Sequence, residues 1–258
     1  MSDVLPIFSD DSSIGDSILT SDEPEEIADN KPVSIWSIAQ KYDLNPVCIL
    51  NTTMISFVKH YKQAQKLNKQ LIFGVKFKIV ENSKDKSEGS LKTESNICVW
   101  IKNSAGYKDL VKLYSAAHAN VDRFYYTGRM DWSLLEEHAS DNLLVTLPFY
   151  SSFLTKNLMN YNHRAIPQFG KIKPIFHIEE HELPFDDLIK RAVVRYCESN
   201  GYEMMQTHSV YYYKKEDTKA YQLFRIIHER TTYEMPELRY FSQPTFSFES
   251  WREKTKHG

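Results

Sequence analysis

The chain has 258 residues, of which 41% are hydrophobic and 26% are charged, and its formal net charge is −2. This length and composition indicate a globular protein with one barrel-like domain or two small ones. A charge near zero provides no overall positive field, so we expect weak or no direct nucleic-acid binding. The three cysteines lie far apart in apolar runs, which favours reduced core thiols in a cytoplasmic protein, and no stretch predicts a membrane span.

The first half of the chain alternates predicted strands and helices. Apolar and β-branched runs predict strands over residues 4–8, 47–50, 71–80 and 97–101. Apolar residues at helical spacing predict helices that begin after Ser34, near Phe57 and after Gly106. Two polar segments, near residues 20–32 and 82–95, contain too little apolar surface to order themselves and are predicted to be flexible loops.

The second half continues the alternation. Strands are predicted over residues 143–147, 172–178 and 204–212, and helices after Asp131, between Pro184 and Gly201, and from Asp217. The last helix is expected to bury Ala220, Leu223, Phe224 and Ile227, which lie at i, i+3, i+4 and i+7. About seven strand–helix repeats favour a parallel, barrel-like α/β fold, in which sites form at the carboxyl ends of the strands.

Several motifs in a consistent order resemble the PHP (polymerase and histidinol phosphatase) domain of bacterial DNA polymerase III alpha subunits. The segment from Thr207 to Tyr212, THSVYY, is similar to the T-N-D-V-H-Y of that family, and FSDDS from Phe8 is similar to H-S-D-Y-S. NTTM from Asn51 resembles H-N-T-M, IFGVKF from Ile72 resembles I-I-G-V-E-F, and the segment from Lys102 to Leu110 resembles K-N-x-x-G-Y-x-x-L. The resemblance implies a distorted parallel (β/α)7-type barrel over residues 1–241, closed by a strand at Pro236 to Phe241, and a C-terminal tail over residues 242–258.

Active members of the resembled family hold a small metal cluster with His, Asp, Glu and Cys side chains at the barrel mouth. The residues of this chain at those positions are poor ligands: Pro6, Phe8, Leu50, Asn51, Lys76, Asn96, Pro148, Ser209 and Tyr211. We therefore expect no catalytic residues, no bound metal and no cofactor. Lys76 could pair with Asp10 in place of the metal, or it could point to solvent at the rim.

A second pattern, HIEEH from His177 to His181, matches the inverted zinc-protease motif. That motif requires both histidines one turn apart on a helix, whereas this segment follows strand-like residues. On a strand the two side chains would lie roughly 13 Å apart. The lysines at 59, 62, 66 and 69 are the best local basic candidates and are expected to form a solvated helix face.

The resemblance implies an inactive PHP-like protein that acts as an interaction or accessory subunit, or as a mimic, in bacterial or bacteriophage DNA replication. The expected partner is a replicative DNA polymerase or a proofreading exonuclease component. The alternative is a divergent phosphoesterase of the same family with a rebuilt site. Phe246, Phe248 and Trp251 in the tail are candidate anchors for the partner, unless the tail packs back on the barrel.

Overall fold

The fold was analysed in a computed structural model, which describes residues 4–13, 15–29, 31–160, 165–229 and 243–256. The chain divides into two compact units. The first comprises Met1–Phe73, Glu179–Pro184 and Gln206–Gly258, and the second comprises Gly74–Ile178 and Phe185–Met205. The expected division was a barrel domain over residues 1–241 and a separate tail, whereas the described tail residues belong to the first unit.

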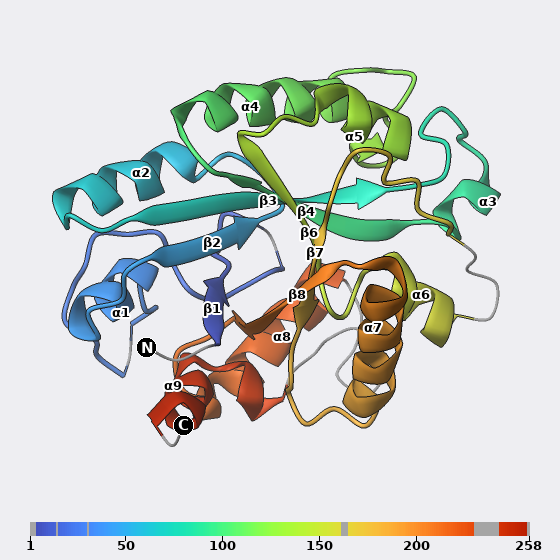
Figure 1. The fold of residues 1–258 in the computed structure, drawn as a ribbon. Helices are drawn as coiled ribbons and strands as arrows, with labels where there is room; N and C mark the ends of the chain where they lie inside the picture. The colour runs from blue at the N-terminus through green and yellow to red at the C-terminus, as the bar shows by residue number, and fades with distance from the viewer. Residues whose placement is uncertain (1–3, 14, 30, 161–164, 230–242, 257–258) are drawn as a thin grey trace. The chain divides into compact units, whose positions relative to one another are not determined.

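The first unit is built on parallel strands with helices beside them (Figure 1). Strand β1 (Leu5–Phe8) pairs in parallel with β2 (Val47–Asn51) and with β8 (Glu203–Val210), so that Ile7 lies opposite both Cys48 and Ser209. Every residue of β2 is buried, as is typical of a parallel strand covered on both faces. The unit also contains α1 (Ile35–Lys41), α2 (Phe57–Lys66), η1 (Lys215–Asp217), α8 (Thr218–Glu229), η3 (Pro244–Phe246) and α9 (Phe248–Lys256).

The second unit contains a mixed sheet. Strand β4 (Ser95–Ile101) runs antiparallel to β3 (Leu71–Ile79) and to β6 (Leu143–Leu147), whereas β6 pairs in parallel with β7 (Ile175–Ile178) and β3 with the short β5 (Arg129–Met130). The expectation of parallel strands fails at β4. The segment between β3 and β4 contains only the four-residue α3 (Glu88–Leu91) and not a full crossover helix, so the chain returns in the opposite direction.

The helices of the second unit pack in pairs. Helix α4 (Ser104–His118) lies beside α5 (Trp132–His138), and α6 (Phe153–Met159) contacts α7 (Asp186–Asn200) (Figure 1). The predicted caps are confirmed: Asp131 accepts the Leu134 N–H at the start of α5, and Gly201 ends α7 at a φ of 69°. No helix in the described part of the chain is both long and apolar enough to cross a bilayer.

Arg129 anchors the segment at residues 82–95, for which the sequence predicts a flexible loop. This side chain is fully buried and donates hydrogen bonds to Ser83 O at 3.2 Å, Asp85 O at 2.9 Å and Ser90 Oγ at 2.9 Å. Ser83 and Ser90 are themselves buried. The polar composition of this segment therefore reflects contacts with a distant arginine, which the local sequence does not reveal.

Helix α8 buries a different stripe from the one that its spacing predicts. Leu223 and Ile227 are 54% and 67% exposed, whereas Tyr221 and Ile226 are 3% and 5% exposed. The ring of Tyr221 stacks on Tyr211, with centroids 5.4 Å apart and planes inclined by 3°. The contact between Tyr221 and Tyr211 orients this helix, and the prediction was wrong because the buried residues lie on nearly the opposite side of the helix from the predicted stripe.

The tail packs on its own unit. Phe246 and Phe248 are 0% and 1% exposed, and the half-buried Trp251 donates from Nε1 to Val4 O at 3.0 Å. The Phe248 N–H donates to Tyr212 O at 2.9 Å, which continues the chain pairing beyond β8. The sequence suggests these three aromatic residues as partner anchors unless the tail packs back, and the structure corrects this for Phe246 and Phe248, which are core residues. The predicted closing strand at Pro236 to Phe241 lies outside the described residues.

Candidate functional site

The carboxyl ends of β1, β2 and β8 bring together most of the sequence-predicted positions of the first unit. Because these strands are parallel, their carboxyl ends meet at one edge of the sheet. In the register, Pro6 lies opposite His208, and Phe8 lies opposite Val210 and Ile49. The predicted positions at or near this edge are Pro6, Phe8, Leu50, Asn51, Ser209 and Tyr211.

Aromatic rings fill two of these positions. Phe8 is fully buried and stacks on Phe248, with ring centroids 5.9 Å apart. Tyr211 follows β8 directly and stacks on Phe246 at 5.4 Å. The ring of Phe8 offers no lone pair to a metal ion, and the tail supplies the ring against which Phe8 and Tyr211 each pack.

Ser209, at the position of a family Asp, is bonded to a buried carboxylate. Its N–H donates to Glu179 Oε2 at 2.9 Å, and its hydroxyl donates to Glu179 Oε1 at 3.0 Å. Glu179 is only 3% exposed and also contacts His181, whose Nε2 lies 2.9 Å from Oε2. The second ring nitrogen of His181 lies 3.2 Å from Thr245 O. Both ring nitrogens of His181 thus face oxygen atoms, one of the Thr245 backbone and one of the Glu179 carboxylate.

His208 lies beside this pair, with its ring centroid 4.4 Å from that of His181. It is 2% exposed, and within the described residues its Nε2 has no hydrogen-bond partner. Burial, together with the nearby charge of His181, lowers the pKa of His208 to about 3. His208 is therefore a neutral core residue at physiological pH.

Asp10 forms a second buried polar cluster in the first unit, with a partner that sequence reasoning missed. Asp10 and His60 are both fully buried, and the carboxylate Oδ2 contacts His60 Nε2. Trp36 donates from Nε1 to His60 Nδ1 at 3.0 Å, so Nδ1 is unprotonated and Nε2 carries the hydrogen that faces Asp10. Asn51 accepts the Asp10 N–H at 3.2 Å and donates to Ser56 Oγ at 2.8 Å.

The pKa of Asp10 follows from this cluster. Burial desolvates the carboxylate and alone would raise its pKa, but hydrogen bonds from His60, Ser56 and Asn51 outweigh burial and lower the pKa below 3.8. The predicted alternative, a pair between Asp10 and Lys76, stays a prediction. His60 could have been found from its helical spacing with Ala64, because both residues are buried on α2, whereas Tyr61 is 48% exposed.

The remaining predicted positions lie in the second unit. Lys76 is half-buried in β3, opposite Cys98 of β4. Asn96 lies opposite Lys78, and its N–H donates to Ser151 O at 2.8 Å. Pro148 follows β6 and is half-buried. A cation, an amide and an imino acid at these positions do not replace the anionic oxygens or imidazoles of a metal cluster.

The donor chemistry does not fit the metal cluster that the family resemblance implies. Within the described ranges, no three His, Cys, Asp or Glu side chains are grouped so that they could hold a metal ion. The HIEEH pattern does not supply one either, because His177 belongs to strand β7 and the pattern requires a helix. We derive no chemical step through a metal at these positions.

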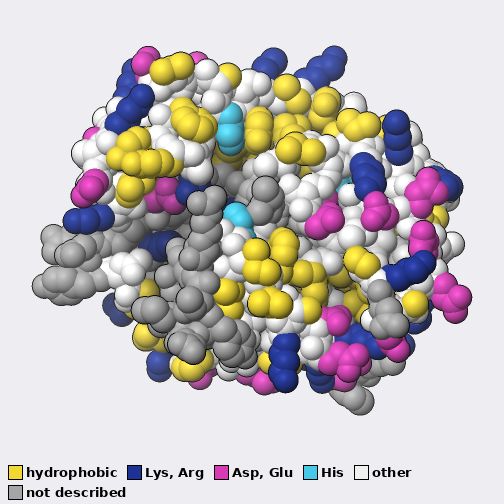
Figure 2. Space-filling view, turned by 180° about the vertical axis from the view of Figure 1, so that it is seen from behind, with side chains coloured by type: hydrophobic (Ala, Val, Ile, Leu, Met, Phe, Trp, Pro, Cys, Tyr) yellow, Lys and Arg dark blue, Asp and Glu magenta, His cyan; other side chains and the backbone are white. Residues whose placement is uncertain are grey.

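The predicted basic face of α2 is largely neutralised by acidic side chains. Lys59 pairs with Asp22 and Lys66 with Glu23 at 2.8 Å, and Lys69, which follows the end of α2, pairs with Asp43. On the face of the molecule shown in Figure 2, Lys and Arg side chains are interspersed with Asp and Glu side chains. Neither the paired lysines nor the mixed charges of this face provide the continuous positive surface that binding to a phosphate backbone requires.

Comparisons with known proteins agree with this scaffold. The sequence pattern of the PHP domain matches residues 28–178. The DNA polymerase III subunit alpha of Borreliella burgdorferi is 24% identical over 196 residues, which cover 72% of this chain and 17% of that protein. The subunit of the same name from Thermus aquaticus is 24% identical over 189 residues, which cover 70% of this chain and 15% of that protein.

The chain thus spans less than a fifth of the length of either relative. The predicted fold class, an α/β barrel of the PHP type, is confirmed by the family match. This prediction was based on the order of the motifs in the sequence and not on any single motif. The chain belongs to the PHP domain family.

Proposed function

We propose that this PHP-domain chain has exchanged metal-dependent chemistry for a binding role in DNA replication. In this role it is an accessory subunit or a mimic that docks a component of a replicative polymerase or a proofreading exonuclease. The two relatives that align with about 70% of this chain at 24% identity are both named as DNA polymerase III subunit alpha. Their names support the replication context.

One observation carries the proposed loss of metal chemistry. At the strand ends of the first unit, the family positions are used for packing and internal hydrogen bonds: Phe8 stacks on Phe248, Tyr211 stacks on Phe246, and Ser209 is bonded to Glu179. Side chains with such partners stabilise the fold. A scaffold that keeps its fold without ligands at these positions retains surfaces on which a partner can dock.

Binding of the purified full chain to purified replication proteins tests the proposal. The immobilised chain is titrated with the replicative polymerase and the proofreading exonuclease of the cells that encode it, and binding is followed by surface plasmon resonance. We expect saturable binding to at least one of them. The absence of binding to both would refute the docking role, and manganese-dependent hydrolysis of a phosphate ester would favour the divergent phosphoesterase.

A further inference from the structure

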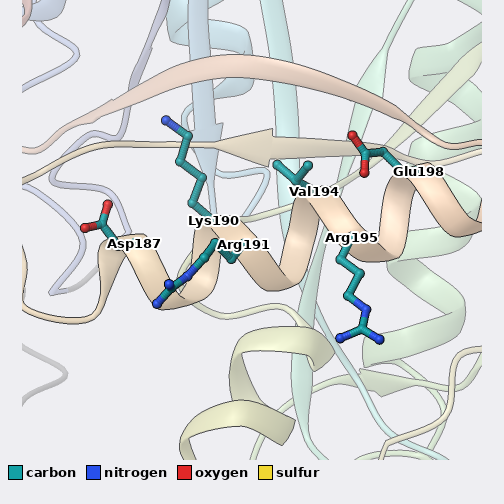
Figure 3. Close-up of a pocket in the computed structure, with 6 residues that line it drawn as sticks. All are labelled: Asp187, Lys190, Arg191, Val194, Arg195 and Glu198. Carbon is teal, nitrogen blue, oxygen red and sulfur yellow. The ribbon is translucent and has the colours of Figure 1, made fainter.

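The exposed face of α7 carries a shallow hollow with an unusual arrangement of charge. The hollow has a volume of about 550 Å³ and is lined by Asp187, Lys190, Arg191, Val194, Arg195 and Glu198. Figure 3 shows Arg191 and Arg195 projecting to the same side of the helix, whereas Lys190, Val194 and Glu198 follow a neighbouring stripe. Three cations thus surround Val194, and one carboxylate lies toward each end of α7.

Arg191 and Arg195 are spaced as i and i+4, so their like charges face each other across one helical turn. Such a pair destabilises a helix slightly unless anions neutralise it. Both side chains are exposed, and within the described residues neither guanidinium has an ion-pair or hydrogen-bond partner. Lys59 and Lys66 of α2 and the nearby Lys69 differ in this respect, because they pair with Asp22, Glu23 and Asp43.

We infer that this hollow is the docking site for an acidic segment of a partner protein. Arginine forms planar, bidentate hydrogen bonds with carboxylates and is enriched at protein interfaces. Two carboxylates of the partner would pair with Arg191 and Arg195, and an apolar side chain between them would contact the half-buried Val194. This inference rests on the proposed docking function and adds the location of the surface and the chemistry of the partner.

The arrangement of charge favours an acidic peptide over a nucleic acid. Asp187 and Glu198 lie 11 residues apart on α7, a distance of roughly 16 Å along the helix axis. A phosphate backbone lying along the helix would meet both carboxylates, whereas a short acidic segment would meet only the cations between them. The net charge of the chain, −2, also provides no long-range attraction for a polyanion.

The test compares two charge reversals in the same unit. The R191E/R195E variant reverses the charge of two side chains in the hollow. The K108E/K112E variant reverses the charge of two exposed lysines at the same i, i+4 spacing on α4, so both variants change the net charge by the same amount. The probes are a fluorescent peptide of alternating glutamate and leucine, its lysine counterpart and a short single-stranded oligonucleotide. Binding is measured by fluorescence anisotropy at low and at physiological salt.

We expect the acidic peptide to bind the wild-type chain about tenfold or more tightly than either other probe. R191E/R195E should weaken this binding about tenfold or more, whereas K108E/K112E should bind as the wild type does. An equal loss of affinity in both variants would show that the net charge alone determines binding, and it would overturn the inference. Tighter binding of the oligonucleotide would assign the surface to nucleic acid and overturn it as well.

The two proposals can fail separately. If a replication protein binds the chain and R191E/R195E does not weaken that binding more than K108E/K112E does, then the docking function stands. In that case the assignment of the docking site to α7 is wrong. If the acidic peptide binds at α7 and no replication protein binds, then the surface stands and the replication role is wrong. Circular dichroism of both variants establishes that each retains the wild-type fold.

Discussion

At the scale of single residues, Ser209 shows why this chain cannot be returned to the family pattern by one substitution. Its hydroxyl lies 3.0 Å from Oε1 of Glu179, a carboxylate that is 3% exposed. An Asp at position 209, the family residue, would place a second carboxylate against the first. We expect S209D to lower the free energy of unfolding by about 2 to 4 kcal/mol at neutral pH.

The matched control is S209N, which has the shape of Asp, keeps an N–H donor for Glu179 and adds no charge. Like-charged neighbours raise the pKa of one carboxyl above its value in the unfolded chain, so the S209D deficit should shrink as the pH falls toward about 4. Urea denaturation of both variants across this range measures the difference. Equal stability of S209D and S209N at neutral pH would show that position 209 does not face Glu179.

The Asp10–His60 pair makes a second prediction at this scale. Because both side chains are fully buried, H60A leaves a charged carboxylate without its ring partner and should cost about 3 to 5 kcal/mol. H60Q, whose amide can still donate to Asp10, should lose less. The lowered pKa of Asp10 means that its contribution to stability is present above about pH 4 and is lost as the pH falls further.

Unfolding free energies measured at several pH values test this account of Asp10. The acid-dependent part of the stability should be smaller in H60A than in the wild type, because the hydrogen bond that lowers the Asp10 pKa has gone. If H60A were as stable as the wild type, the carboxylate would have another partner. In that case the earlier prediction of an Asp10–Lys76 pair would gain support.

At the scale of the element, Asp131 links the start of α5 to the segment held by Arg129. One carboxylate oxygen accepts the Leu134 N–H at 3.0 Å, and the other accepts the Ser83 N–H at 3.1 Å. Burial opposes ionisation, but hydrogen bonds from Ser83, Ser133 and the backbone outweigh it and lower the pKa of Asp131 from 3.8 to about 2. D131A should therefore lose about 2 to 3 kcal/mol at neutral pH.

Thermal unfolding at different pH values distinguishes the stability that the helix cap provides from the stability that the charge of Asp131 provides. The stability that the lowered pKa provides is present above about pH 4 and is lost as the pH falls toward 2. D131N keeps an oxygen for the cap but cannot titrate, so its melting temperature should vary less across this window than that of the wild type. The same acid dependence in D131N and in the wild type would remove Asp131 as its source.

Most strands could be predicted well from the sequence, but the buried face of helix α8 could not. Runs such as residues 47–50 are apolar throughout and are flanked by polar or turn residues, which predicts them as buried strands. Helix α8 has apolar residues around most of its surface, so the contact between Tyr221 and Tyr211 decides its orientation. The two-residue strand β5 and helix α6 lack a periodic pattern long enough to be recognised.

The candidate site was predictable only as a set of missing ligands. The family motifs identify the positions of Phe8, Ser209 and Tyr211, but they do not reveal which side chains contact these residues and their neighbours. The contacting residues lie far along the chain: His60 lies 50 residues from Asp10, and Glu179 lies 30 residues from Ser209. Only the fold brings these side chains together, because no local spacing connects them.

At the scale of the whole molecule, the described tail is part of the core of the first unit. Phe248 is 1% exposed and contacts the rings of Phe8, Tyr42 and Trp251. F248A should lower the free energy of unfolding by about 3 to 5 kcal/mol. E253Q, which removes only the exposed pair with Lys215, should change it by about 0.5 kcal/mol or less.

Urea unfolding of the full-length variants gives both values. A loss in F248A no larger than that in E253Q would mean that the tail does not pack as described. It would also restore the tail aromatics as candidates for partner contact. The expected large loss means that truncating the tail would unfold the first unit, so truncation is unsuitable for mapping a partner.

The central claim is that the former metal positions of this PHP domain now carry packing and hydrogen-bonding side chains. Elemental analysis of the tag-free full chain, after exposure to manganese or zinc and gel filtration, tests it most directly. We expect no stoichiometric metal, because the side chains at these positions offer no convergent set of carboxylates, imidazoles or thiolates. Retention of one or more ions per chain, lost on treatment with a chelator, would contradict the claim.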